Sequence, residues 1–183
     1  AYSIRCVPQI LGAVYDVIES HNKTVTIELN SVTDNPIFVL PEEIVLHGGN
    51  FQGHSIAMAA DNLYNAVTNI AIHSERKIAR ITDAKLNNGL PPFLQGNKNG
   101  LQSGFMGAQV TATAVLAWIR SNATPSSIQS ISTNANNQDV VSMGTIAALK
   151  TSECIDRVFD ILAMEGLALS QAFELKDGFN RKT

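Results

Sequence analysis

The feature that most constrains the fold is a stripe of apolar and small residues between residues 54 and 82. Its members alternate in steps of four and three through about seven turns, close to the 3.5-residue repeat of helices that pack along one another. At 1.5 Å per residue this helix would be about 42 Å long, and helices of that length occur mostly in bundles. The sequence therefore predicts an all-α bundle of long helices. The stripe consists of Ile56, Ala60, Leu63, Val67, Ile70, Ser74, Ile78 and Ile81.

Three other segments carry helical stripes, and we expect them to form helices over about 5–30, 103–122 and 137–172. The first should end before Asn35-Pro36, because a proline pushes the preceding residue out of the α region. Residues 37–50 predict a small hairpin or an irregular segment that ends at Gly48-Gly49. Polar residues predict connections over 84–103 and 123–136. We expect one helical-bundle domain over 1–175 and a polar tail over 176–183.

Composition limits the partners that the chain can have. Hydrophobic residues make up 45% and charged residues only 16% of the 183 residues, so we expect apolar surface that meets other subunits. The net charge of −3 and the lack of a basic run argue against nucleic acid. No membrane span or signal peptide is visible, and Cys6 and Cys154 are expected to be free thiols in a reducing, cytoplasmic setting. The four histidines have no ligand spacing, so we expect no metal.

A cluster of side-chain amides lies just ahead of the last predicted helix. Asn134, Asn136, Asn137 and Gln138 stand within five residues. Burying such groups without partners would cost roughly 1–3 kcal/mol for each unmet group. Either water, a polar ligand or a second chain must therefore solvate them. A capping turn explains one or two of the amides, and four of them favour a polar binding site.

Eight short motifs, in order, resemble the aromatic amino acid ammonia-lyase and aminomutase family, whose members act on histidine, phenylalanine or tyrosine through a methylidene-imidazolone electrophile. The resemblance covers nearly the whole chain and implies the aspartase/fumarase-like helical core. The motifs are Tyr2-Ser3-Ile4-Arg5-Cys6-Val7-Pro8-Gln9, Ser31-Val32-Thr33-Asp34-Asn35-Pro36, Gly48-Gly49-Asn50-Phe51, Ala59-Ala60-Asp61-Asn62, Ser74-Glu75-Arg76, Leu90-Pro91-Pro92-Phe93-Leu94, Ser103-Gly104-Phe105-Met106 and Asn137-Gln138-Asp139-Val140-Val141-Ser142-Met143-Gly144.

Two departures from the family pattern bear on activity. The family forms its electrophile from an Ala-Ser-Gly tripeptide, and this sequence contains none. The Gln-Asp pair of the first motif and the tyrosine that serves the family as catalytic base would both precede Ala1. The resemblance therefore implies the central portion of such an enzyme, which by itself should be inactive.

Arg5 is the strongest candidate for a ligand-binding residue, because a guanidinium can pair with a carboxylate through two parallel hydrogen bonds. Tyr2 lies three residues earlier and would share a helical face with it. The resemblance implies a catalytic role for Tyr2, which would donate a hydrogen bond beside the electrophile. It also implies that Phe51 contacts the substrate ring and that Asn134, Asn137 and Gln138 line the pocket.

Each of these residues also has a structural interpretation. Arg5 could form a surface ion pair, Tyr2 and Phe51 could simply pack, and the amides could cap a helix. Family members that act on histidine carry glutamate where Gln138 stands, so the amide favours phenylalanine or tyrosine as the substrate. For Asp61, Glu75 and Arg76 we expect interhelical ion pairs rather than catalytic roles.

The sequence thus leaves three functions open. The first is an aromatic amino acid ammonia-lyase whose parent protein is a homotetramer, with pockets where several subunits meet. The second is a 2,3-aminomutase of the same family. The third is a helical assembly module without catalytic activity.

Overall fold

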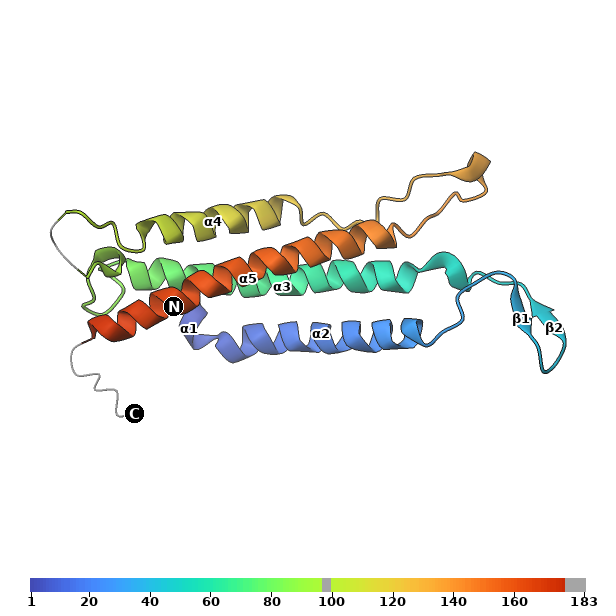
Figure 1. Cartoon of the computed structure of the whole chain (residues 1–183), viewed down its shortest axis with the longest axis horizontal. Helices are drawn as coiled ribbons and strands as arrows, with labels where there is room; N and C mark the ends of the chain where they lie inside the picture. The colour runs from blue at the N-terminus through green and yellow to red at the C-terminus, as the bar shows by residue number, and fades with distance from the viewer. Residues whose placement is uncertain (97–99, 177–183) are drawn as a thin grey trace. The chain divides into compact units, whose positions relative to one another are not determined.

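The computed structural model describes residues 1–96 and 100–176 and is mostly helical (Figure 1). This confirms the predicted all-α fold with a small two-stranded segment. The helices of four or more residues are α1 (Tyr2–Arg5), α2 (Val7–Leu29), α3 (His54–Thr82), α4 (Met106–Ser121) and α5 (Gly144–Leu175). Of the tail predicted over 176–183, residues 177–183 lie outside the described residues. No described helix is long and apolar enough to cross a membrane.

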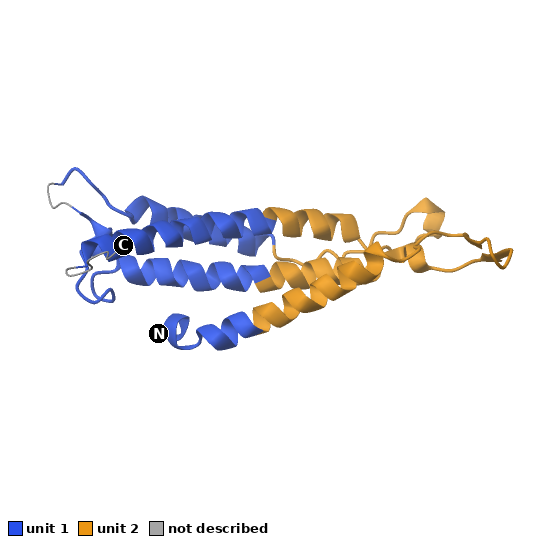
Figure 2. Cartoon of the chain, turned by 60° about the horizontal axis from the view of Figure 1, so that its bottom comes forward, with its two compact units in different colours: residues 1–12, 67–122, 154–183 blue, residues 13–66, 123–153 orange. Residues whose placement is uncertain are grey.

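The chain divides into two compact units, each built from discontinuous segments (Figure 2). Unit 1 comprises residues 1–12, 67–122 and 154–183, and unit 2 comprises residues 13–66 and 123–153. Ile78, Ile119 and Ile161 are fully buried in unit 1. In unit 2 the buried side chains are mostly small, with Ala57 and Ala147 at 0% exposure. Because alanine side chains are short, they let backbones approach closely.

Hydrogen bonds from side chains join the helices within each unit. In unit 2 the Thr151 hydroxyl of α5 donates to the Ala60 carbonyl of α3 at 2.9 Å. The His21 ring of α2 contacts the Ala59 carbonyl through Nδ1 at 3.2 Å. These bonds tie helices that are far apart in the sequence.

Most predicted helix boundaries agree with the structure, and α3 begins and ends where the stripe predicted. The prediction for the last helix was wrong by seven residues, because α5 begins at Gly144 and not near Asn137. Residues 137–143 instead run beside the chain that precedes them, where the Thr133 amide donates to the Gln138 carbonyl at 3.0 Å. Met143 has φ of +56°, which is incompatible with a continuing right-handed helix.

The segment after α2, predicted as a hairpin or an irregular segment, is a hairpin. Strands β1 (Ile37–Val39) and β2 (Ile44–Leu46) are antiparallel, with Phe38 opposite Val45. The Asn35 side chain closes the hairpin by accepting the Gly48 amide at 3.0 Å. The Asn35-Pro36 peptide is cis.

The connection between α3 and α4 was predicted to be exposed, and this is wrong for two of its residues. Leu94 is 1% exposed and joins a cluster with Ala168 and Ala172 of α5. Asn87 is 8% exposed, and its amide donates to the carbonyls of Ile81 and Pro91. The burial of Leu94 depends on contacts with α5, which is distant in the sequence, so local polarity does not reveal it. Residues 97–99 of this connection lie outside the described residues.

Gly104 is expected to tolerate no side chain. Its φ is +55°, and a Cβ there would overlap the Phe93 carbonyl oxygen, which accepts the Phe105 amide at 2.7 Å. We predict that Gly104→Ala lowers the free energy of unfolding by about 2 kcal/mol, seen as a lower melting temperature. The matched control is Gly107→Ala in α4, where a Cβ meets nothing within 4 Å. That change should raise stability by up to about 1 kcal/mol, because alanine is the better helix former. Equal melting temperatures for the two variants would contradict the prediction.

Within residues 1–96 and 100–176, the three charged residues predicted to form interhelical ion pairs form none. Asp61 accepts the backbone amides of Ser126 and Ser127 at 3.0 and 2.8 Å, within unit 2. Glu75 and Arg76 pair with each other along α3, in unit 1. Glu75 does form an interhelical hydrogen bond, but its partner is uncharged: the Thr113 hydroxyl of α4 donates to the Glu75 carboxylate at 2.8 Å.

The Glu75 carboxyl should make stability sensitive to acid. Burial raises its pKa, but hydrogen bonds from Arg76 and Thr113 outweigh burial, so the pKa lies below its ordinary value of 4.5. A carboxyl with a lowered folded-state pKa contributes stability that is complete above the unfolded pKa and is lost as pH falls through the folded pKa. We predict that the melting temperature of the wild type falls more steeply below pH 4.5 than that of Glu75→Gln. Glu153→Gln, at an exposed glutamate, should keep the wild-type slope, and parallel curves for Glu75→Gln and wild type would contradict the prediction.

Candidate functional site

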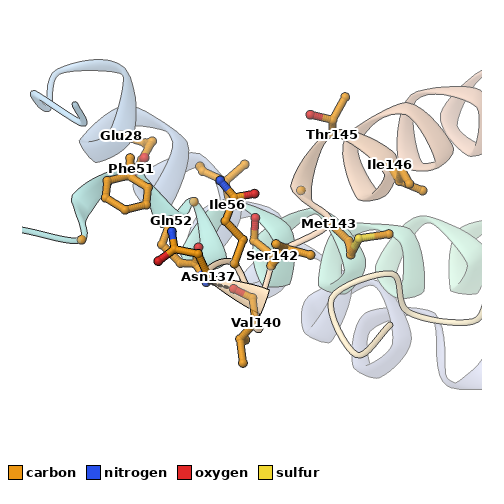
Figure 3. A pocket seen from close by; sticks show the side chains of 15 residues that line it. Glu28, Phe51, Gln52, Ile56, Asn137, Val140, Ser142, Met143, Thr145 and Ile146 are labelled. Atoms are coloured by element: carbon orange, nitrogen blue, oxygen red, sulfur yellow. Dashed lines mark hydrogen bonds between the residues drawn. The ribbon is translucent and has the colours of Figure 1, made fainter. Parts of the chain in front are cut away.

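An open cavity of about 1030 Å³ lies within unit 2 (Figure 3). Its lining comes from the end of α2, the segment 49–56 and the segment 137–146. Phe51, Asn137 and Gln138, which the sequence predicted as site residues, all line it. The fold therefore brings together three predicted residues from two segments more than 80 positions apart.

Phe51 is placed by a single short turn, η1 (Asn50–Gln52), which directly precedes α3. The Gln52 amide donates to the Gly49 carbonyl at 3.0 Å, and Gly53 leaves the turn with φ of +66°, a conformation that glycine adopts without strain. The Gln52 side chain donates to the Val140 carbonyl at 2.8 Å. This bond joins the turn that carries Phe51 to the segment that carries Asn137 and Gln138. The Phe51 ring is 57% exposed.

Gln138 is held by its partner across the loop. The Thr133 and Gln138 backbones exchange two hydrogen bonds, and the Thr133 hydroxyl donates to the Gln138 Oε1 at 2.8 Å. The side-chain oxygen of Gln138 is therefore an acceptor for Thr133, and its side-chain nitrogen acts as a hydrogen-bond donor. The loop thus fixes the orientation of one amide that lines the cavity.

Asn134 does not line the cavity, so the structure does not group it with Asn137 and Gln138. Residues Asn134–Asn136 form a tight turn in which all three residues have positive φ. This turn lies in the polar connection that the sequence predicted over 123–136. Asn136, also in the amide cluster, accepts the Ser132 hydroxyl at 2.8 Å.

Tyr2 and Arg5 belong to unit 1, at the two ends of the four-residue helix α1. Both side chains are exposed, Tyr2 at 78%. The predicted helical spacing of the two residues agrees with the structure. No residue of α1 is buried.

One cavity residue was missed by the sequence reasoning. Glu28, in the last turn of α2, carries the only ionisable side chain among the described residues that line the cavity. Its position at the end of a predicted helix gave no signal, because helix ends commonly carry charged residues. Ile56, Val141 and Met143 give the cavity apolar walls, and Gln52, Ser142 and Thr145 add polar groups to the lining.

Comparisons with known proteins agree with the motifs. A sequence profile for the family described as "Aromatic amino acid lyase" matches residues 1–182. The chain is 58% identical over 179 residues to a tyrosine ammonia-lyase of Cereibacter sphaeroides, which covers 97% of this chain and 34% of that protein. It is 44% identical over 180 residues to an MIO-dependent tyrosine 2,3-aminomutase of Streptomyces globisporus, covering 98% of this chain and 33% of that protein.

A solved structure of a relative has the same fold as this chain. The structure of a phenylalanine aminomutase from Pantoea agglomerans superposes with a TM-score of 0.93 at 40% identity, covering 98% of this chain and 35% of that chain. The chain thus spans about a third of the length of the relatives it matches. On the match along residues 1–182, this chain belongs to the aromatic amino acid lyase family.

Proposed function

We propose that the chain is a portion of a longer enzyme that eliminates ammonia from an aromatic amino acid to give the α,β-unsaturated acid. The observation that carries the proposal is the cavity of unit 2, where Phe51, Asn137 and Gln138 meet in a chain of this family. A cavity with apolar walls and a few polar groups is the usual form of a small-molecule site. The cavity volume of about 1030 Å³ leaves room for an amino acid and for groups from other parts of the enzyme.

The reaction sets three tasks, and this chain supplies residues mainly for the first of them, which is to hold the substrate. The substrate must be held by its carboxylate and its ring, and its amino group must become a leaving group while a β-proton is removed. We assign the carboxylate to Arg5, since a guanidinium stays charged at every working pH. The aromatic ring of the substrate is assigned to Phe51, where offset or edge contacts add about 0.5–1.5 kcal/mol. Tyr2 would donate a hydrogen bond beside the reacting amino group.

The methylidene-imidazolone group, when present, supplies the electrophile that turns the amino group into a leaving group. Its Ala-Ser-Gly precursor is not in this sequence, so we assign it to the remainder of the full-length protein. The residues present fit a neutral, planar organic group, since Asn137 and Gln138 offer uncharged amides beside the Phe51 ring. We accordingly expect the isolated chain to be inactive.

The two sets of residues lie in different units, and we propose that the site is completed when several copies assemble, as a homotetramer. Large apolar side chains on α5 support this, because Phe159 and Leu167 are each 64% exposed on the single chain. Exposed apolar side chains of this size mark surfaces that meet partners.

Gln138 is expected to select the substrate. Its neutral amide favours tyrosine or phenylalanine, whereas a carboxylate there would pair with an imidazolium. We predict that Gln138→Glu in the full-length enzyme shifts the ratio of kcat/KM for histidine over tyrosine upward by about tenfold, which corresponds to about 1.4 kcal/mol. The control is Gln129→Glu, since Gln129 lies outside the cavity and donates to the Pro125 carbonyl at 3.2 Å. An unchanged ratio of kcat/KM in Gln138→Glu would show that Gln138 does not select the substrate.

The aminomutase reaction is the second candidate, because aminomutases are as similar to this chain as several ammonia-lyases are. Full-length protein incubated with tyrosine, phenylalanine or histidine distinguishes the two. A lyase yields coumarate, cinnamate or urocanate, detected by ultraviolet absorbance, and a mutase yields the β-amino acid, detected by chromatography. Absence of both products with all three amino acids would overturn the proposal. The assembly module without catalytic activity would then be the remaining interpretation.

A further inference from the structure

Helix α1 carries the two candidate residues of unit 1, Tyr2 and Arg5. Helix α1 is only four residues long, has no buried residue and has no side-chain cap. Isolated helices of this length are unstable in water, because nucleation fixes several residues for one hydrogen bond. Something outside α1 must therefore hold it in place.

A buried histidine of α3 makes the contact that holds it. His73 is 5% exposed, and its Nε2 lies 2.8 Å from the carbonyl oxygen of Ser3, 70 residues away in the sequence. A carbonyl oxygen only accepts, so Nε2 carries the hydrogen and donates it. Both residues belong to unit 1.

The acceptor has a special position within α1. The amides of Ile4 and Arg5 donate to the Ala1 carbonyl, and the amide of Cys6 donates to the Tyr2 carbonyl at 2.8 Å. The Ser3 carbonyl belongs to the last turn, where helix carbonyls have no partner within their own helix. His73 supplies a partner from outside, and Ser3 lies between Tyr2 and Arg5.

We propose that His73 is a positioning residue that holds α1, and with it the Arg5 guanidinium, in the orientation needed to bind the substrate carboxylate. The inference rests on the proposed function for the role of Arg5, but the anchoring of α1 is independent of it. Without the donor, the part-buried Ser3 carbonyl would have to turn toward water to find another partner, because a carbonyl without a hydrogen bond is unfavourable where it is shielded from water. The short helix would then lose its fixed orientation.

Two amide variants form a matched pair for the test. In His73→Gln the side-chain nitrogen reaches the position of the histidine Nε2, so the bond to Ser3 can form. In His73→Asn the amide is one carbon shorter and cannot reach. Both keep a polar, uncharged group on α3, so a difference between them reports the bond and not the loss of the ring.

Amide hydrogen exchange of the full-length protein, followed by mass spectrometry, tests the anchoring. We expect the amides of Ile4, Arg5 and Cys6 to exchange at least tenfold faster in His73→Asn than in wild type, and within about threefold of wild type in His73→Gln. Peptides from α4 should be unchanged in both variants, which shows that the fold is intact. Equal exchange of α1 in wild type and His73→Asn would overturn the inference.

Steady-state kinetics test the link to Arg5. We expect His73→Asn to raise KM about tenfold with a smaller change in kcat, and His73→Gln to restore KM. In the background of Arg5→Ala, His73→Asn should change kcat/KM by less than threefold, because the residue that it positions is gone. Additive effects of the two changes would overturn the inference. If the wild type is inactive with every amino acid, the proposed function fails, and the exchange measurement alone decides the anchoring.

Discussion

Arg5→Ala in the full-length enzyme is expected to lower kcat/KM for the aromatic amino acid by roughly 30-fold to several thousandfold. Loss of one partner of a desolvated, hydrogen-bonded charge pair costs about 2–5 kcal/mol, and each 1.36 kcal/mol corresponds to a factor of ten. The kcat/KM of Arg5→Lys should lie between that of the wild type and that of Arg5→Ala, because the ammonium keeps the charge but cannot form two parallel hydrogen bonds. Steady-state rates with product absorbance provide the measurement.

A second arginine provides the control for this prediction. Arg157 pairs with Asp160 at 3.3 Å, and both side chains are about half exposed. Exposed pairs of this kind contribute about 0–1 kcal/mol, so Arg157→Ala should leave kcat/KM within about threefold of wild type. If Arg5→Ala behaves like Arg157→Ala, the assignment of the substrate carboxylate to Arg5 is wrong.

The largest expected effect on stability comes from Lys77. Within unit 1, its ammonium pairs with Glu165 at 2.5 Å, and the Ser74 hydroxyl donates to the other carboxylate oxygen at 2.6 Å. Glu165 is 7% exposed, so Lys77→Met would leave a buried carboxylate without its countercharge. We expect a loss of about 3 kcal/mol in the free energy of opening of α3, measured by native-state amide exchange.

A double variant separates the missing countercharge from a general packing defect. Replacing both partners by apolar residues of similar size is often neutral or stabilising, so Lys77→Met with Glu165→Leu should recover most of the lost stability. Lys23, an exposed lysine of α2, serves as the control, and Lys23→Met should have little effect. A double variant that is less stable than Lys77→Met would show that packing, and not the countercharge, dominates at this site.

The two tests probe different parts of the chain. Arg5 is exposed on a four-residue helix, so its replacement should alter activity and leave the fold intact. Lys77 and Glu165 join α3 to α5, so their replacement should alter stability first. The Arg5 prediction therefore depends on the proposed function, whereas the Lys77 prediction depends only on the structure.

The motifs predicted some, but not all, of their residues correctly as lining the cavity. Phe51, Asn137 and Gln138 were chosen from motifs, and the structure places all three around one cavity. Asn134 was chosen on the same grounds and lies outside that lining, in a tight turn whose three residues have positive φ. A motif gives the residue types and their order, but the backbone conformation decides which of them face a common space.

The sequence alone determined the long helices and the family, and it limited residues 37–50 to a hairpin or an irregular segment. The stripe through α3 repeats every three to four residues, so its two ends could be predicted at about 54 and 82, and the helix spans His54–Thr82. Helical periodicity is a local property, set by contacts within one turn. This is why boundaries marked by a stripe and a proline were predicted well.

Tertiary structure decided everything that depends on a distant partner. Pairing with Thr133 keeps Gln138 out of α5, and contacts with α5 bury Leu94 in a connection that is otherwise polar. The bond from His73 to Ser3 spans 70 residues and leaves no periodic trace in the sequence. A hydrogen bond or a buried contact depends on where two segments meet in space, and the pattern of either segment alone does not contain that information.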